Sequence, residues 1–110
     1  MFTFETVSMY RVAVGLNDQK SKKQEIETEK AFDIVSEYCA NHFGGATVTM
    51  SKGIYKHEDG ITVVRENTIV IDLVYVTESE IETMVNEFKE IFNQESVMVI
   101  SFPKVQCTFA

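Results

Sequence analysis

The chain has 110 residues, of which 45% are hydrophobic and 25% charged, with one proline and five glycines. This balance is typical of one folded domain spanning residues 1–110, and it excludes a largely disordered chain. The formal net charge of -7 repels phosphate backbones, so we expect no direct binding of nucleic acid.

The first two predicted elements are a strand and an amphipathic helix. From Val7 to Leu16 the side chains alternate in the period-two pattern of a strand, and we expect it near the centre of a sheet. After a solvated, lysine-rich loop, apolar residues recur at three-and-four spacing between Thr28 and Phe43, which predicts a helix. Gly44 follows it, as is common where a helix ends.

The middle of the chain reads as a hairpin. A strand is predicted from about Ala46 to Tyr55, and a long extended segment from Ile61 to Val76. Between them stand a histidine and two acids, His57-Glu58-Asp59. Three consecutive loop residues cannot all converge on one substrate, so we interpret this triplet as the tip of the hairpin and not as a catalytic site.

A second helix and a last strand complete the predicted order. Thr77 and Glu80 have the spacing of a capping box at the start of the helix. The last strand is expected from Ser96 to Phe102, with the residues after Pro103 forming a short edge strand or packing against the domain. The fold class is therefore α+β, a ferredoxin-like split βαββαβ arrangement in which two helices cover one face of a four-stranded antiparallel sheet.

The uncovered face of that sheet is predicted to be apolar, because both alternating sets of strand residues are largely apolar. Soluble monomers seldom expose an apolar patch of that size. We therefore expect a homodimer or higher homo-oligomer that packs through the sheet face, with the C-terminal tail or a ligand as the alternative cover.

Charged and aromatic residues within the predicted strands are the candidate site. A charge in an apolar strand needs a partner, and Arg11 has two candidates, Asp72 and Glu66. By the period-two count Arg65 and Asp72 face opposite sides of the sheet. One interpretation is an ion pair that fixes strand register or an interface. The other is a polar floor for a small ligand, made by Arg11, Tyr55, Arg65, Glu66 and Asp72.

No catalytic residue, metal site or cofactor is predicted. Cys39 and Cys107 lack the spacing of zinc or redox motifs, and we expect buried, reduced thiols in a cytoplasmic protein. The N-terminal segment does not resemble a signal peptide, and no apolar run approaches the roughly 20 residues of a membrane span.

Several short motifs resemble one known family. "GIYKHEDGITVVREN" and "FNQESVMVI", together with "VAVGL" on the first strand, are similar to the small bacterial domains catalogued as domain of unknown function 3574. The resemblance covers roughly residues 10 to 102 and implies a fold and a tendency to self-associate, without implying a reaction. The residues that carry it are Gly53, Tyr55, Gly60, Arg65, Glu66, Phe92, Gln94, Glu95, Ser96 and Val97.

These observations favour a non-enzymatic interaction or small-ligand-binding domain that acts as a symmetric homo-oligomer. One alternative is an acidic, phage-encoded inhibitor of a basic host protein that binds nucleic acid or acts in defence, which the charge of -7 would suit. Another is a dimeric ferredoxin-like enzyme with a pocket at the open sheet face.

Overall fold

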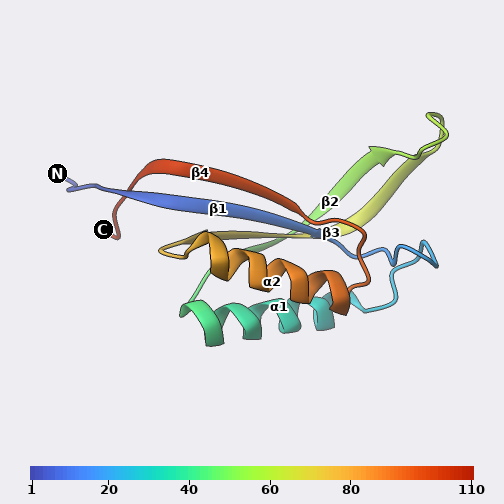
Figure 1. The fold of residues 1–110 in the computed structure, drawn as a ribbon, viewed down its shortest axis with the longest axis horizontal. Coiled ribbons are helices and arrows are strands. Elements are labelled where there is room, and N and C mark those ends of the chain that lie inside the picture. Colours follow the sequence, from blue (N-terminus) through green and yellow to red (C-terminus); the bar gives the residue numbers. More distant parts are fainter.

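A computed structural model describes all 110 residues and confirms the predicted α+β fold class (Figure 1). The elements in chain order are β1 (Glu5–Gly15), α1 (Thr28–Phe43), β2 (Thr47–Lys56), β3 (Val63–Val74), α2 (Glu78–Ile91) and β4 (Met98–Cys107). The four strands form one antiparallel sheet in the order β2-β3-β1-β4, and both helices lie on the same side of it. Neither helix is long and apolar enough to cross a membrane.

The hydrophobic core lies between the helices and one face of the two central strands. On β1 and β3 every second residue points toward the helices, and Val12, Val14, Ile69 and Ile71 are fully buried there. The helices contribute their own apolar stripes, centred on Val35 and Phe88. The core is therefore one-sided, as the alternation of the strands requires.

The helix ends follow the sequence signals. Thr77 and Glu80 form the predicted capping box, in which the Thr77 hydroxyl accepts a hydrogen bond from the Glu80 backbone amide at 3.2 Å. Gly44 caps the C-terminal end of α1 in a left-handed conformation, with a φ of 76°, which glycine adopts without strain.

The last strand is longer than predicted. β4 does not end before Pro103 but continues through it to Cys107, with a register shift against β1 between Val7 and Met9. β4 is an edge strand, and proline is tolerated there because its missing N–H need not face a neighbouring strand. The prediction that the strand ends before Pro103 is therefore wrong, because an edge strand can continue through a proline.

The sheet extends past the helices at both ends (Figure 1). At one end lie the two chain termini. At the other, the β2–β3 hairpin bends away from the helix layer, and we call its residues 53–65 the hairpin arm. The molecule is accordingly elongated, with principal extents of 50 × 29 × 24 Å.

Candidate functional site

The face of the sheet that the helices leave uncovered carries the candidate site, and we call it the open face. Its apolar side chains are only partly buried within one chain. All four strands contribute to the open face. Its apolar and polar residues include Met9, Arg11, Ala13, Gly15, Gly53, Tyr55, Glu66, Val70, Asp72, Val74, Met98, Ile100 and Phe102.

An ion pair lies in the middle of the open face. Arg11 and Asp72 stand opposite each other on β1 and β3, and the Arg11 guanidinium donates two hydrogen bonds to the Asp72 carboxylate, at 2.8 and 3.1 Å. These bonds and the negative charge of Asp72 raise the pKa of Arg11. Of the two partners that the sequence offers Arg11, the structure selects Asp72, and the pair fixes the register of the two central strands.

A second polar group on the open face is the Glu66 carboxylate, which lies against the end of β1. Its Oε2 atom accepts a hydrogen bond from the backbone N–H of Asn17 at 2.9 Å. A Cβ atom at position 15 would fall within 2.8 Å of the carboxyl carbon and both its oxygens, so only glycine leaves room for this carboxylate. Gly15 and Asn17 therefore form a seat for Glu66.

Two residues of β2 complete the surroundings of Glu66. Gly53 is the register partner of Glu66, and a Cβ atom there would lie 2.7 Å from the Thr68 hydroxyl and 3.6 Å from the Glu66 Cγ. Tyr55 pairs with Val64, which places it diagonally across from Glu66 on the same face, roughly 7–8 Å away between backbones. Burial raises the pKa of Tyr55, and the negative charge of Glu66 raises it further.

The five candidate residues thus separate into three groups. Arg11 and Asp72 form one, and Tyr55 and Glu66 form another, six residues further along β3 or about 20 Å away at ~3.3 Å per residue. Arg65 belongs to neither, because its side chain is on the face that the helices cover, and it is exposed on the hairpin arm. A single polar floor made by all five residues is therefore not formed within one chain.

Gly15 and Asn17 are the part of the site that the sequence does not reveal. The "VAVGLN" segment reads as a strand followed by a stop, and nothing in it identifies which side chain fills the space beside the glycine. That space is defined by the sheet order, which places β3 next to β1 although α1 and β2 separate them in sequence.

The acidic triplet at the hairpin tip is structural, as predicted. The Asp59 carboxylate accepts hydrogen bonds from the backbone amides of Ile61 and Thr62, each at 2.8 Å, and from the Thr62 hydroxyl. These bonds lower the pKa of Asp59 to about 2. Asp59 is therefore occupied in closing the turn, and the structure contains no group of three His, Cys, Asp or Glu side chains arranged to hold a metal ion.

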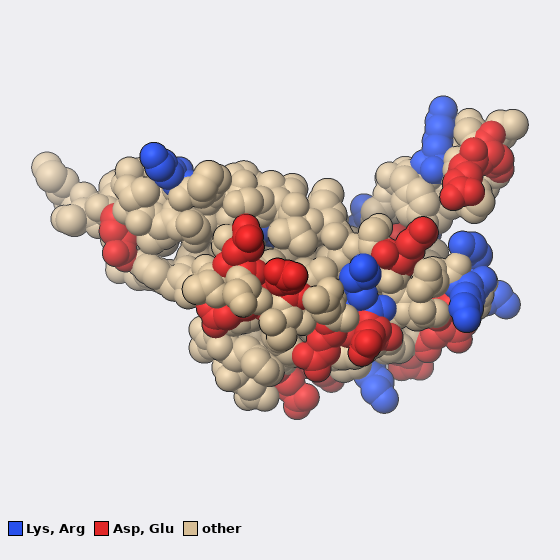
Figure 2. Space-filling view, viewed as in Figure 1, with Lys and Arg blue, Asp and Glu red and all other residues tan.

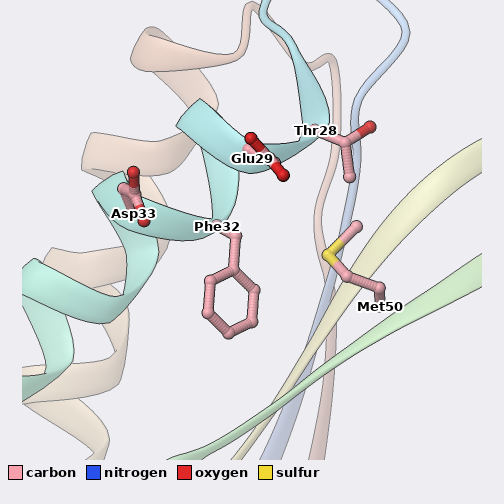
Figure 3. Close-up of a pocket in the computed structure, with 5 residues that line it drawn as sticks. All are labelled: Thr28, Glu29, Phe32, Asp33 and Met50. Carbon is pink, nitrogen blue, oxygen red and sulfur yellow. The ribbon is translucent and has the colours of Figure 1, made fainter.

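A shallow depression lies on the opposite side of the sheet from Glu66, between α1 and β2 (Figure 3). It has a volume of about 340 Å³ and is lined by Thr28, Glu29, Phe32, Asp33 and Met50. Phe32 and Met50 are each 36% exposed, because α1 covers the outer strand β2 incompletely. None of the five candidate residues lines it.

Charge is unevenly distributed over the molecule. Figure 2 shows acidic residues gathered over the helix layer, whereas lysines cluster at the end from which the hairpin arm projects. The connection between β1 and α1, which contains Lys20, Lys22 and Lys23, lies at this end (Figure 1). An anionic surface thus covers the helices, and the Glu66 seat lies away from it on the other side of the sheet.

Comparison with known proteins identifies the family. The family model described as "Protein of unknown function (DUF3574)" matches residues 10–109. This chain belongs to that family. No curated protein sequence matches it. Two solved structures share its fold: a phage SAM lyase in complex with S-methyl-5'-thioadenosine, at 20% identity and a TM-score of 0.65, and a phage SAM lyase in the apo state, at 21% identity and the same TM-score. Each match covers 99% of this chain and 95% of the other.

The expectation of a non-enzymatic interaction or ligand-binding domain is wrong, because both of the solved structures described above, which share this fold, are of a phage SAM lyase. The alternative of an acidic inhibitor of a host protein is set aside with it. The physical reason is that the open face is more than an apolar contact surface. It also carries a carboxylate held in a defined position beside a tyrosine.

Proposed function

We propose that this chain is an enzyme, a lyase that acts on S-adenosylmethionine (SAM) through Glu66 and Tyr55 on the open face. The observation that carries the proposal is the seat of Glu66, where Gly15 and the Asn17 amide hold a carboxylate in a fixed place beside a phenol. The fold shared with a phage SAM lyase supports the choice of substrate.

The chemistry of SAM suits this pair of residues. Its sulfonium and ammonium groups are cations, which a carboxylate attracts and an aromatic face binds by cation–π interaction. The Tyr55 phenol is neutral at physiological pH, since its pKa is raised further above an already high ordinary value, and it can donate a hydrogen bond. We assign Glu66 to binding and orienting the cationic part of the substrate, and Tyr55 to packing against it.

The bond that breaks joins the sulfonium to the amino-acid chain of SAM. Its electron pair stays on sulfur, so the sulfonium becomes the neutral thioether S-methyl-5'-thioadenosine. The carbon that leaves sulfur forms a new bond to an oxygen of the substrate's own carboxylate, which closes a lactone. The two products then account for every atom of SAM, with no water added and no proton transferred. Holding the flexible chain in one conformation favours such an internal step, because orientation lowers its entropic cost.

The test is whether purified protein releases S-methyl-5'-thioadenosine from SAM, followed by liquid chromatography and mass spectrometry. Glu66→Gln keeps the shape of the side chain and removes its charge, and we expect turnover to fall about 100-fold. Glu82→Gln, the same change at an exposed position of α2, is the matched control and should leave turnover unchanged. A wild-type protein without turnover, or a fully active Glu66→Gln variant, would contradict the proposal.

We also propose that copies of the chain associate through the open face and enclose the site between them. The accessible surface is 7450 Å², whereas a compact monomer of 12.5 kDa is expected to expose about 6,200 Å². The excess of about 1,300 Å² is comparable to one partner's share of a permanent interface. Tyr55 is 49% exposed in the single chain, so the substrate would stay open to water without a second copy.

Neighbouring residues of β4 offer a matched pair for testing this association. Met98 points to the open face and is 56% exposed, whereas Val99 points to the helix side and is 42% exposed. We expect light scattering to give a multiple of 12.5 kDa for the wild type and for Val99→Asp, and a smaller mass for Met98→Asp. A wild-type monomer at micromolar concentration, or an unaffected Met98→Asp assembly, would contradict the association.

We also propose that the chain acts in the cytoplasm, where cysteines stay reduced. Both cysteines are free thiols, with Cys39 buried and Cys107 half-buried. Burial raises the pKa of Cys39 to about 11, so this thiol is protonated and unreactive at neutral pH.

A further inference from the structure

Two loops that are far apart in sequence are joined next to the Glu66 seat. The segment 17–19 follows β1, and the segment 93–94 follows α2. Four hydrogen bonds link them: Gln94 Nε2 to the Asn17 carbonyl at 2.6 Å, Asn93 Nδ2 to the Asp18 carboxylate at 2.8 Å, Gln19 Nε2 to the Asn93 side-chain oxygen at 2.9 Å, and the Gln19 amide to the Asn93 carbonyl at 3.0 Å. We call this set of bonds the loop clamp.

Local geometry keeps both sides of the loop clamp rigid. Asn93 has a φ of 47°, a left-handed conformation that asparagine tolerates better than most residues. The Asp18 carboxylate accepts hydrogen bonds from the backbone amides of Lys20 and Ser21, at 2.8 and 3.0 Å. The bonds from Ser21, Asn93 and Lys20 lower the pKa of Asp18, so it remains ionised at neutral pH.

Asn17 connects the loop clamp to Glu66. Gln94 holds the carbonyl of Asn17, and the N–H of the same Asn17 donates to the Glu66 carboxylate at 2.9 Å. The preceding residue, Leu16, is still paired to β3 through its amide and the Asn67 carbonyl at 3.0 Å. Asn17 is therefore fixed on both sides, and its N–H can point in only one direction.

We propose that Gln94 and Asn93 are positioning residues for the active site: by holding the segment 17–19 they aim the Asn17 N–H at Glu66 and fix where its carboxylate lies. This inference rests on the proposed function for its catalytic consequence. It gives the "NQ" of the "FNQESV" motif a role beyond ending the helix α2.

The bonding of Gln94 distinguishes positioning from simple helix capping. Its side-chain amide also donates to the carbonyl of Phe92 at 3.1 Å, which is enough to cap the end of α2. The shorter bond, at 2.6 Å, goes across to Asn17 and does nothing for the helix. The same amide group thus joins the end of α2 to the residue that holds Glu66.

The test uses Gln94→Glu, which keeps the length of the side chain but removes its donors. Exchange of the Asn17 amide is followed by NMR, and lyase turnover is measured in parallel. We expect exchange of this amide to accelerate at least about tenfold, kcat to fall about tenfold, and KM to change less than about twofold, since a misplaced group acts mainly on the oriented transition state. Gln106→Glu, the same change on the exposed edge strand β4, is the control and should alter neither.

A second variant protects the test against a folding defect. Asn93→Gly retains the left-handed backbone and removes the side-chain bonds to Asp18 and Gln19, and it should reproduce both effects in weaker form. If exchange of the Asn17 amide stays slow in both variants, the inference is overturned. It is also overturned if exchange accelerates while kcat is unchanged. If exchange of the Asn17 amide accelerates in the variants but the wild type shows no lyase turnover, the proposed function and the catalytic role of the loop clamp are both wrong. The structural link from Gln94 to Asn17 is then still supported.

Discussion

The two faces of the sheet are built from the same strands and differ in almost every physical respect. On the helix side Val12 and Ile71 are fully buried, and the core contains no buried polar or charged side chain. One residue away along each strand, Arg11 and Asp72 stand on the open face among half-buried apolar side chains. Alternate residues along the strands thus have different roles: one set forms the core, and the other is the set to which we assign substrate binding.

The largest expected effect tests this division on one strand. Ile71→Ala removes a fully buried side chain from the helix face and should lower the free energy of unfolding by about 2–5 kcal/mol. Its neighbour Val70 lies on the open face, and Val70→Ala should cost about 1 kcal/mol or less in dilute solution. Chemical denaturation of both variants measures the difference.

Protein concentration sharpens the same comparison. If copies of the chain cover the open face, the cost of Val70→Ala rises with concentration, because association stabilises only the folded state. The cost of Ile71→Ala should not change in this way. Equal costs for the two variants at every concentration would show that the faces are not energetically distinct.

The next effect concerns activity on the open face. Gly15→Ala places a methyl group where the Glu66 carboxylate lies, and displacement by about 1 Å can reduce turnover up to about 100-fold. Gly45→Ala is the matched control, since a Cβ atom there meets nothing within 4 Å and its backbone is not left-handed. Full activity in Gly15→Ala would mean that the position of Glu66 does not matter to the reaction.

A smaller expected effect, on the pKa of Tyr55, tests whether Tyr55 and Glu66 lie close together and needs no assay of turnover. The Glu66 charge contributes to raising the pKa of Tyr55 above its ordinary value of 10.0, so Glu66→Gln should lower that pKa. Tyrosine titration followed by NMR measures the change. Asp72→Asn, about 20 Å along β3, should leave it unaltered. An unchanged Tyr55 titration in Glu66→Gln would separate the two residues and remove the basis for a shared site.

The smallest effect lies at the hairpin tip, outside both faces. Asp59 has a folded-state pKa of about 2, below its ordinary 3.8, so its contribution to the turn is complete above about pH 4 and is lost as the pH falls through about 2. The amides of Ile61 and Thr62 should stay protected from exchange down to about pH 3. In Asp59→Asn this protection should no longer depend on pH in that range, and the core should be unaffected.

Much of the fold follows from sequence because it depends on local patterns. Period-two alternation predicts the faces of β1 and β3, and it correctly separates Arg65 from Asp72. The capping box at Thr77 and the pairing of Arg11 with Asp72 follow from spacing and from the need to neutralise a charge.

The site is harder to predict because its parts are brought together by the sheet and by loops. Glu66 in sequence is one acid among many, and the "NQES" segment resembles an ordinary helix exit. Their significance appears only when Gly15 and Asn17 are seen beside the Glu66 carboxylate, with Gln94 bonded to the Asn17 carbonyl. No local pattern encodes such a contact, which joins residues separated by 49 and 77 positions.

The path of β4 through Pro103 bears on how copies of the chain meet. Both β2 and β4 are outer strands, and an outer strand with free N–H groups invites strand-to-strand growth into fibres. Pro103 withholds one of these groups, and the register shift beside it breaks the regular spacing of the rest. The margin of the sheet on that side is thereby a poor template for endless edge-to-edge polymerisation, which is compatible with the closed assembly proposed above.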